Sequence, residues 1–159
     1  MSADPVPSPR QRVAAYAVLT RDGQVLLTRM SARTRIEGRW TLPGGGIEHG
    51  EEPRDALRRE VYEETGLRIE PGRLVDVHAS HFVAPNAAGV VEDYHGIHLI
   101  FEAAIEGPSR DLTPHVVEQD GSTERAEWVP LSRAEELDLL GAARHALGLL
   151  ERDPLDGEE

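Results

Sequence analysis

The chain has 159 residues, of which 39% are hydrophobic and 29% are charged, and its formal net charge is −12 at pH 7. This length and composition are typical of one globular domain, and the negative charge disfavours binding to nucleic acid or to an anionic membrane. The chain contains no cysteine, which excludes disulfides and thiolate chemistry and suits a cytoplasmic location. Its apolar runs are too short to cross a membrane.

Three segments are expected along the chain. Residues 1–10 are rich in proline and predict a disordered tail, and residues 152–159 form an acidic tail. Residues 11–151 are expected to form a single domain. In this domain strands come first, one helix follows, and further strands and helices close the chain. This order predicts an α+β fold or an α/β/α sandwich with a mixed β-sheet.

The first predicted elements form a hairpin. Residues 13–20 and 24–30 are rich in strand-forming side chains and flank an Asp-Gly pair, which is a turn signal. Residues 39–53 begin as a short strand and become a glycine-dense loop, for which no regular structure is expected.

A helix is predicted over residues 53–65. Pro53 suits a first helical position, and Gly66 suits the left-handed position that follows a last turn. Leu57 and Val61 are four residues apart, so they would share the face that packs against a core.

Strands, a long loop and two helices are expected after this helix. Residues 67–83 predict a strand with a Pro-Gly turn, and residues 108–124 predict a polar loop of the length that functional loops often have. The other expected elements are a loop over 85–89, strands over 96–107 and 126–131, a short helix containing 133–137, and a helix over 140–151.

Three glutamates share one face of the predicted helix. Glu60, Glu63 and Glu64 are spaced i, i+3 and i+4, and like charges at this spacing cost a helix roughly 0.2–0.5 kcal/mol per pair. A hard divalent cation such as Mg²⁺ prefers carboxylate oxygens and would turn this repulsion into attraction. A solvated helix face is the common alternative for adjacent glutamates.

Neighbouring residues are expected to support the glutamate face. Arg59 precedes Glu63 by four residues and would hold its carboxylate in one rotamer. Glu51 lies just before the helix and is placed to reach Arg59, a role that positions metal ligands. Gly44 and Gly45 allow close approach of the backbone to a cation or a phosphate, with a loop carbonyl as a further ligand.

Residues 45–67, "GGIEHGEEPRDALRREVYEETGL", resemble the signature of the Nudix hydrolases. That signature is G, five residues, E, seven residues, RE, an aliphatic residue, any residue, EE, any residue, G and an aliphatic residue. The preceding "WTLPGG" is similar to the usual lead-in of the family. The matching positions are Gly45, Glu51, Arg59, Glu60, Val61, Glu63, Glu64, Gly66 and Leu67.

The resemblance implies a fold and a reaction. The fold would be an α/β/α sandwich with a mixed β-sheet, in which the signature is a loop–helix–loop. The reaction would be attack of water on a phosphorus of the diphosphate in a nucleoside diphosphate linked to another group, with Mg²⁺ or Mn²⁺. Glu60, Glu63 and Glu64 would bind metal, and Arg59 would orient a glutamate. The substrate would be a nucleoside triphosphate, an oxidised nucleotide, ADP-ribose or a similar small nucleotide, and the chain would form a homodimer by analogy.

Two other functions are known on this fold. A ligand sensor or regulator without catalysis usually lacks signature carboxylates, whereas this chain keeps all of them. An isomerase of isoprenoid diphosphates would need a catalytic cysteine, which the chain does not have. Hydrolysis is therefore the favoured function.

The general base and the phosphate ligands are less defined by the sequence. The loop before the strand over 126–131 offers Glu118, Asp120, Glu124 and Glu127, of which Glu124 is favoured by its position shortly before Trp128. Solvated loop acids are the alternative. Arg29 and Arg39 belong to the densest positive stretch, which also contains Arg33 and Arg35, and they are predicted to bind substrate phosphates.

Four histidines lie in or near two strands that would pair. His78, His81, His95 and His98 would line a pocket or face solvent. A zinc site is a further alternative.

Overall fold

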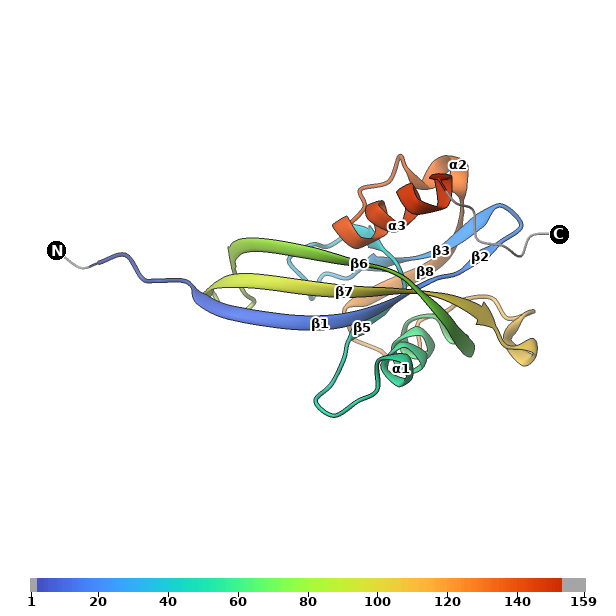
Figure 1. The fold of residues 1–159 in the computed structure, drawn as a ribbon, viewed down its shortest axis with the longest axis horizontal. Helices are drawn as coiled ribbons and strands as arrows, with labels where there is room; N and C mark the ends of the chain where they lie inside the picture. The colour runs from blue at the N-terminus through green and yellow to red at the C-terminus, as the bar shows by residue number, and fades with distance from the viewer. Residues whose placement is uncertain (1–2, 153–159) are drawn as a thin grey trace.

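The computed structural model describes residues 3–152 of the chain. Two sheets lie between helices, with α1 on one side and α2 and α3 on the other (Figure 1). The elements are β1 (Ser8–Val18), β2 (Thr20–Arg21), β3 (Gln24–Met30), β4 (Trp40–Thr41), β5 (Gly44–Gly46), α1 (Pro53–Thr65), β6 (Ile69–Pro85), β7 (Val91–Ile105), the 3₁₀ turn η1 (Gly107–Ser109), β8 (Thr123–Pro130), α2 (Leu131–Ala134) and α3 (Gly141–Arg152).

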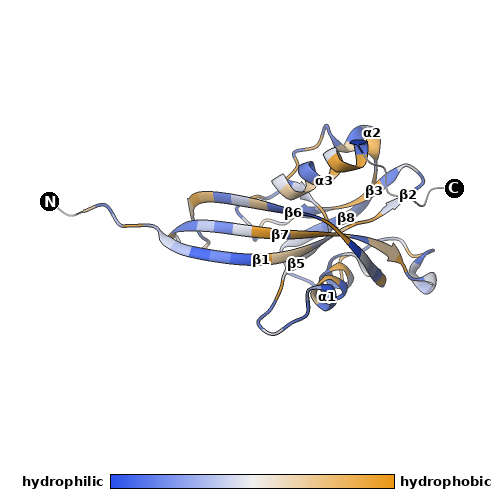
Figure 2. Ribbon diagram, viewed as in Figure 1, coloured by the Kyte–Doolittle hydropathy of each residue, from blue (hydrophilic) through white to orange (hydrophobic). Residues whose placement is uncertain are grey.

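The larger sheet is mixed and has the strand order β5-β1-β7-β6. β1 runs parallel to β7 and antiparallel to β5, while β6 and β7 form an antiparallel hairpin. The ends of β1, β6 and β7 project beyond the helices as a three-stranded arm (Figure 1). The projecting end of β1 is hydrophilic, and β1 becomes hydrophobic where it enters the body of the molecule (Figure 2).

The smaller sheet is built around β3, which pairs with β2, β4 and β8. The predicted Asp-Gly turn before β3 is confirmed, because β2 and β3 pair antiparallel around Asp22 and Gly23, whose φ angles are 50° and 73°. Two positive φ values in succession match the type I′ turns that join such strands. Most of the expected first strand of this hairpin, residues 13–18, instead belongs to β1 and pairs with β5 and β7.

Two core clusters hold the helices to the sheets. On one side Leu57 and Val61 of α1 pack with buried residues that include Ala15 and Leu26. On the other side α3 packs Ala143, Ala146 and Leu147 against a cluster that includes Leu42 and Ile100. The predicted α/β/α sandwich with a mixed sheet is therefore confirmed.

The ends of α1 follow the sequence closely. Pro53 starts the helix, and Gly66 follows it with a φ of 72° and donates its N–H to the Tyr62 carbonyl at 2.8 Å. Glycine adopts this left-handed conformation without steric strain, because it has no Cβ.

Several predicted boundaries are wrong. β1 begins at Ser8, inside the expected disordered tail, because its first residues pair with β7 from Glu92 onward. Gly44–Gly46 form strand β5 on the edge of β1 instead of an irregular loop. Pro71 and Gly72 lie inside β6 at a register shift and make no chain reversal.

The hairpin around residues 86–90 also differs from the prediction, since β7 begins at Val91, before the expected start at residue 96. α3 begins at Gly141, close to its expected place. α2 covers only Leu131–Ala134, so residues 135–137 of the expected short helix are not helical. Most of the expected acidic tail, residues 153–159, lies outside the described residues.

Candidate active site

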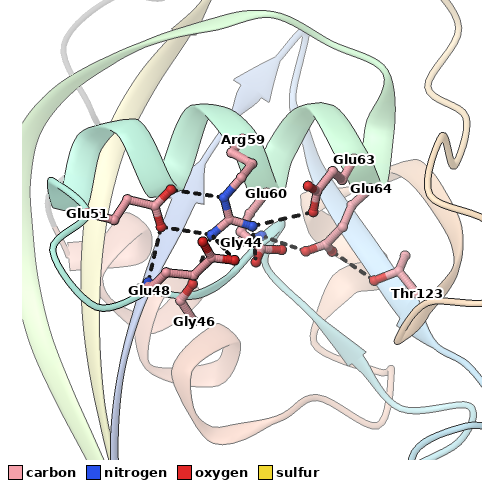
Figure 3. A network of polar contacts seen from close by, with 9 residues as sticks. All are labelled: Gly44, Gly46, Glu48, Glu51, Arg59, Glu60, Glu63, Glu64 and Thr123. Atoms are coloured by element: carbon pink, nitrogen blue, oxygen red, sulfur yellow. Dashed lines mark hydrogen bonds and ion pairs between the residues drawn. The ribbon is translucent and has the colours of Figure 1, made fainter.

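A cavity of about 890 Å³ lies between the mixed sheet, the signature helix α1 and the first residues of α3. Its wall includes Glu60, Glu63 and Glu64 of α1 together with Gly44 and Gly45 of β5. Because α1 is anchored through its apolar face, its glutamate face is turned toward this cavity (Figure 3). The predicted metal-binding residues thus all line this cavity.

Arg59 is the centre of a polar network that joins α1 to the preceding loop (Figure 3). Its Nε and Nη2 atoms donate to the two carboxylate oxygens of Glu51 at 2.9 and 2.8 Å, and Nη2 also donates to the Gly46 carbonyl at 3.2 Å. The hydrogen bonds from Arg59 lower the pKa of Glu51 to about 2. This bidentate contact between Arg59 and Glu51 is consistent with the predicted positioning role of both residues.

Arg59 also contacts two of the three glutamates. Its Nη1 atom donates to Glu60 Oε1 at 2.9 Å and lies 3.5 Å from Glu63 Oε2. The Glu60 carboxylate lies directly over Gly45, where a Cβ atom would come within 2.6 Å of the carboxyl carbon. Glycine at position 45 therefore provides the space that the Glu60 carboxylate occupies.

Glu63 has a second acidic neighbour, Glu118. Partial burial, followed by the charges of Glu60 and Glu118, raises the pKa of Glu63 above its ordinary value. The loop that carries Glu118 is tied to the end of α1, because the amides of Val117 and Glu118 both donate to the Glu63 carbonyl at 2.9 Å. This anchoring brings the Glu118 side chain to the cavity wall.

Glu64 is the most buried of the glutamates, with 6% of its surface exposed. Its carboxylate accepts hydrogen bonds from the Gly44 amide at 3.3 Å and from Thr123 Oγ1 at 2.8 Å. Burial raises its pKa well above the ordinary value, although these hydrogen bonds act in the opposite direction.

The donor types fit a divalent cation, because the carboxylates of Glu60, Glu63 and Glu64 all line the cavity beside the backbone of β5. Arg59 stands between Glu60 and Glu63, while Glu64 turns toward Thr123. Within residues 3–152, no three acidic or histidine side chains converge closely enough to form a complete metal site. Burial is the largest cause of the raised pKa of Glu63, and the neighbouring charges of Glu60 and Glu118 raise it further.

The two predicted phosphate ligands, Arg29 and Arg39, and the predicted base, Glu124, form ion pairs with other side chains. Arg29 and Glu124 form an ion pair with each other, and neither is among the residues that line the cavity. Arg39 does line the cavity, but its guanidinium donates to Asp138 at 3.2 Å and to the Leu139 carbonyl at 3.1 Å. These contacts hold the segment before α3 against β4.

Sequence reasoning missed several cavity residues. Arg12 of β1 lines the cavity and has no acidic partner within 4 Å among the described residues. Tyr94 and Phe82 also line it, beside Tyr16. Strand alternation could have grouped Arg12 with Tyr16, but their alignment with Tyr94 depends on the pairing of β1 with β7.

The four predicted histidines fall on opposite faces of the β6–β7 hairpin. His78 and His98 pair across the strands with their Nδ1 atoms 3.1 Å apart, and His98 lines the cavity. His81 and His95 pair on the other face, where His81 bonds Asp93 at 2.5 Å. The cluster is therefore divided between a pocket-lining pair and an outer pair.

The NUDIX domain family matches residues 9–149, which include every cavity residue named above. The chain belongs to the Nudix family. The chain is therefore a hydrolase that acts on the diphosphate linkage of nucleoside diphosphate derivatives. Nudix hydrolases generally require a divalent metal. None of the helices in residues 3–152 is long and apolar enough to cross a membrane.

Individual Nudix proteins resemble the chain over most of its length. The nucleoside triphosphatase NudI of Enterobacter sp. (strain 638) is 35% identical over 141 residues, which cover 85% of this chain and 93% of that protein. NudI of Escherichia fergusonii is 34% identical over 143 residues, which cover 88% of this chain and 96% of that protein.

Solved structures agree with this assignment. The MutT Nudix hydrolase of Burkholderia pseudomallei is 31% identical with a TM-score of 0.64, covering 87% of this chain and 97% of that one. The MutT protein of Methanosarcina mazei Go1 is 22% identical with a TM-score of 0.72, and the match covers 94% of this chain and 98% of that one. This second similarity shows the shared fold.

Proposed function

We propose that this chain hydrolyses nucleoside triphosphates to a nucleoside monophosphate and pyrophosphate, with Mg²⁺ or Mn²⁺. The observation that carries the proposal is that Glu60, Glu63 and Glu64 of α1 line one cavity, large enough for a nucleotide, with Glu118 beside Glu63. The similarity to proteins named nucleoside triphosphatase supports this substrate class. When bound, a divalent cation would supply Lewis acidity, neutralising phosphate charge and activating water.

The chain's own residues hold the reacting groups in place. Glu60, Glu63 and Glu64 would provide the metal-binding carboxylates, and the Gly45 backbone would lie beside them. Arg59 fixes the Glu60 carboxylate while Glu51 fixes Arg59. Such preorganised charge is the main contribution that a protein makes to phosphoryl transfer, because little covalent chemistry is left for its side chains.

Glu118 replaces Glu124 as the proposed general base. Glu118 lines the cavity beside Glu63, whereas Glu124 is paired with Arg29 outside the lining. A base must lie within reach of the water that it deprotonates, so position in the cavity decides between the two. Arg12 likewise replaces Arg29 as the proposed phosphate ligand, since it lines the cavity.

The direct test is turnover of nucleoside triphosphates with Mg²⁺, measured as pyrophosphate release. Glu63→Gln is expected to lower kcat by about 100-fold or more, because it removes a charged metal ligand. Glu52→Gln is the matched control, since Glu52 lies at the helix N-terminus with no side-chain capping bond. Equal turnover in Glu63→Gln and the wild type would contradict the assignment.

Binding without turnover would instead favour the sensor function. The homodimer expected by analogy stays a prediction, and sedimentation velocity over a range of protein concentrations would test it.

A further inference from the structure

One end of the cavity is built without carboxylates. The acidic residues of the lining come from α1, from the loop before it and from the Glu118 loop. The arm strands β1, β6 and β7 instead contribute Arg12, Ser80, Phe82, Tyr94 and His98. The cavity therefore has an acidic end and an uncharged, aromatic end, with the Arg12 guanidinium packed over Gly46 beside the acidic end.

Gly96 lies beneath three side chains that line the uncharged end. It is buried in β7, opposite Arg12 of β1 and Ser80 of β6. A Cβ atom at Gly96 would lie 2.9 Å from His98 Nε2, 3.1 Å from Ser80 Oγ and 3.1 Å from Tyr94 Cε1. Three side chains thus close over a position that has no side chain of its own, and any other residue there would push them apart.

An aromatic surface stands beside these polar atoms. Phe82 and Tyr94 are cross-strand partners, with ring centroids 5.1 Å apart and an interplanar angle of 31°. Phe82 is 50% exposed although it lines the cavity. A large aromatic ring left half open in a cavity wall is suited to stack on a flat ligand.

The polar atoms of this end are held in place and are neutral. His98 is fixed by the 3.1 Å contact between its Nδ1 and that of His78 and by an edge contact with Tyr16. Burial lowers the pKa of His98 to about 4, so its ring is uncharged at neutral pH. Its Nε2 atom, over Gly96, and Ser80 Oγ can therefore exchange hydrogen bonds with a neutral polar edge.

We propose that Phe82, Tyr94, Ser80 and His98, set over Gly96, form a subsite that binds the nucleobase of the substrate. This inference rests on the proposed function. The base stacks on the Phe82–Tyr94 surface and meets His98 and Ser80 with its edge. The phosphates then extend past Arg12 toward the glutamates of α1, so the cavity orients the nucleotide along its length.

Two substitutions test the subsite. Gly96→Ala displaces His98, Ser80 and Tyr94 without changing their chemistry, and Phe82→Leu removes the stacking ring. Each is expected to raise KM for nucleoside triphosphates about tenfold or more, with kcat changed less than about threefold. Binding of nucleoside monophosphates should weaken by a similar factor, while inhibition by inorganic pyrophosphate should stay unchanged.

Matched controls separate this effect from general damage. Gly107→Ala adds the same methyl group where nothing lies within 4 Å, and Val83→Leu changes the next residue of β6, whose side chain points to the opposite face. Both controls should behave as the wild type. Circular dichroism checks that each variant is folded. If Gly96→Ala does not fold, the KM and monophosphate binding of Phe82→Leu and His98→Gln test the subsite in its place.

The outcomes distinguish this inference from the proposed function. Wild-type turnover with unchanged KM and unchanged monophosphate binding in Gly96→Ala and Phe82→Leu would overturn the subsite alone. A wild type that binds monophosphates through Phe82 but hydrolyses no triphosphate would overturn the function and support the subsite. A wild type that neither binds nor hydrolyses nucleotides would overturn both.

Discussion

Glu118 and Glu124 belong to the same segment of the chain, yet only Glu118 reaches the cavity. The difference arises from backbone contacts, because the Val117 and Glu118 amides bond the end of α1, whereas Glu124 already belongs to β8. Glu118→Gln is expected to lower kcat by about 100-fold, within the range for loss of a general base. Glu124→Gln should leave kcat within about threefold of the wild type. The reverse ranking, measured by steady-state kinetics, would restore Glu124 as the base.

Glu64 makes a prediction about stability in the metal-free protein. Burial raises its pKa in the folded state, so the folded chain holds this proton more tightly than the unfolded chain does. Its contribution to stability is complete below the unfolded pKa of about 4.5 and is lost as the pH rises through the folded pKa. Glu64→Gln should therefore flatten the fall in unfolding free energy as the pH rises above 5.

The measurement is urea unfolding at several pH values in a chelator. Glu52→Gln should keep the wild-type slope, because its side chain makes no capping bond. Identical pH dependence in Glu64→Gln and the wild type would show that Glu64 ionises freely in the folded chain.

The loop before α1 and the helix itself are joined by one guanidinium. Arg59 binds Glu51 with two hydrogen bonds and Gly46 and Glu60 with one each, a pattern that a single ammonium group cannot reproduce. Arg59→Lys is expected to lower kcat about 10–100-fold with little change in KM.

Arg58→Lys is the matched control on the same helix. Arg58 pairs with Asp55 and Glu70 on the exposed side, away from the cavity. Wild-type kcat in Arg59→Lys would mean that the bidentate contact is unnecessary for positioning.

Elements whose contacts are local were predictable from the sequence. The offsets within one loop and one helix sufficed to place Glu51, Arg59 and the three glutamates together, because helical geometry fixes their spacing. The end of α1 at Gly66 followed from glycine chemistry. The turn before β3 followed from its Asp-Gly pair.

Elements whose contacts are distant in sequence could not be predicted in this way. Strand β5 exists because three glycines fit against β1, and Pro71–Gly72 stays extended because its neighbours pair with β7. The choice of Glu118 depends on where a long loop crosses α1. The uncharged end of the cavity needs β1, β6 and β7 in register, which local patterns do not specify.

For the whole molecule, metal binding should appear as thermal stability. Mg²⁺ at 100 times its Kd would add about 2.7 kcal/mol to the unfolding free energy, which raises Tm by roughly 5–10 °C for a chain of this size. Replacing Glu60, Glu63 and Glu64 together by glutamine should abolish most of this rise and stabilise the metal-free protein. Calorimetry with Mg²⁺ and with a chelator measures both effects, and an unchanged metal response in the triple variant would place the cation elsewhere.

The parallel pairing of β1 with β7 has a consequence for how the chain folds. Gln11 and His95, which bond each other in these strands, are 84 residues apart in sequence, whereas β6 and β7 are neighbours in the chain. Closing so long a loop costs more entropy than forming a hairpin, so the β6–β7 pair is expected to form early and β1 to dock late. During synthesis the first strand must wait unpaired until more than half of the chain has left the ribosome. The uncharged end of the cavity, which needs all three strands, is then among the last parts of the molecule to be completed.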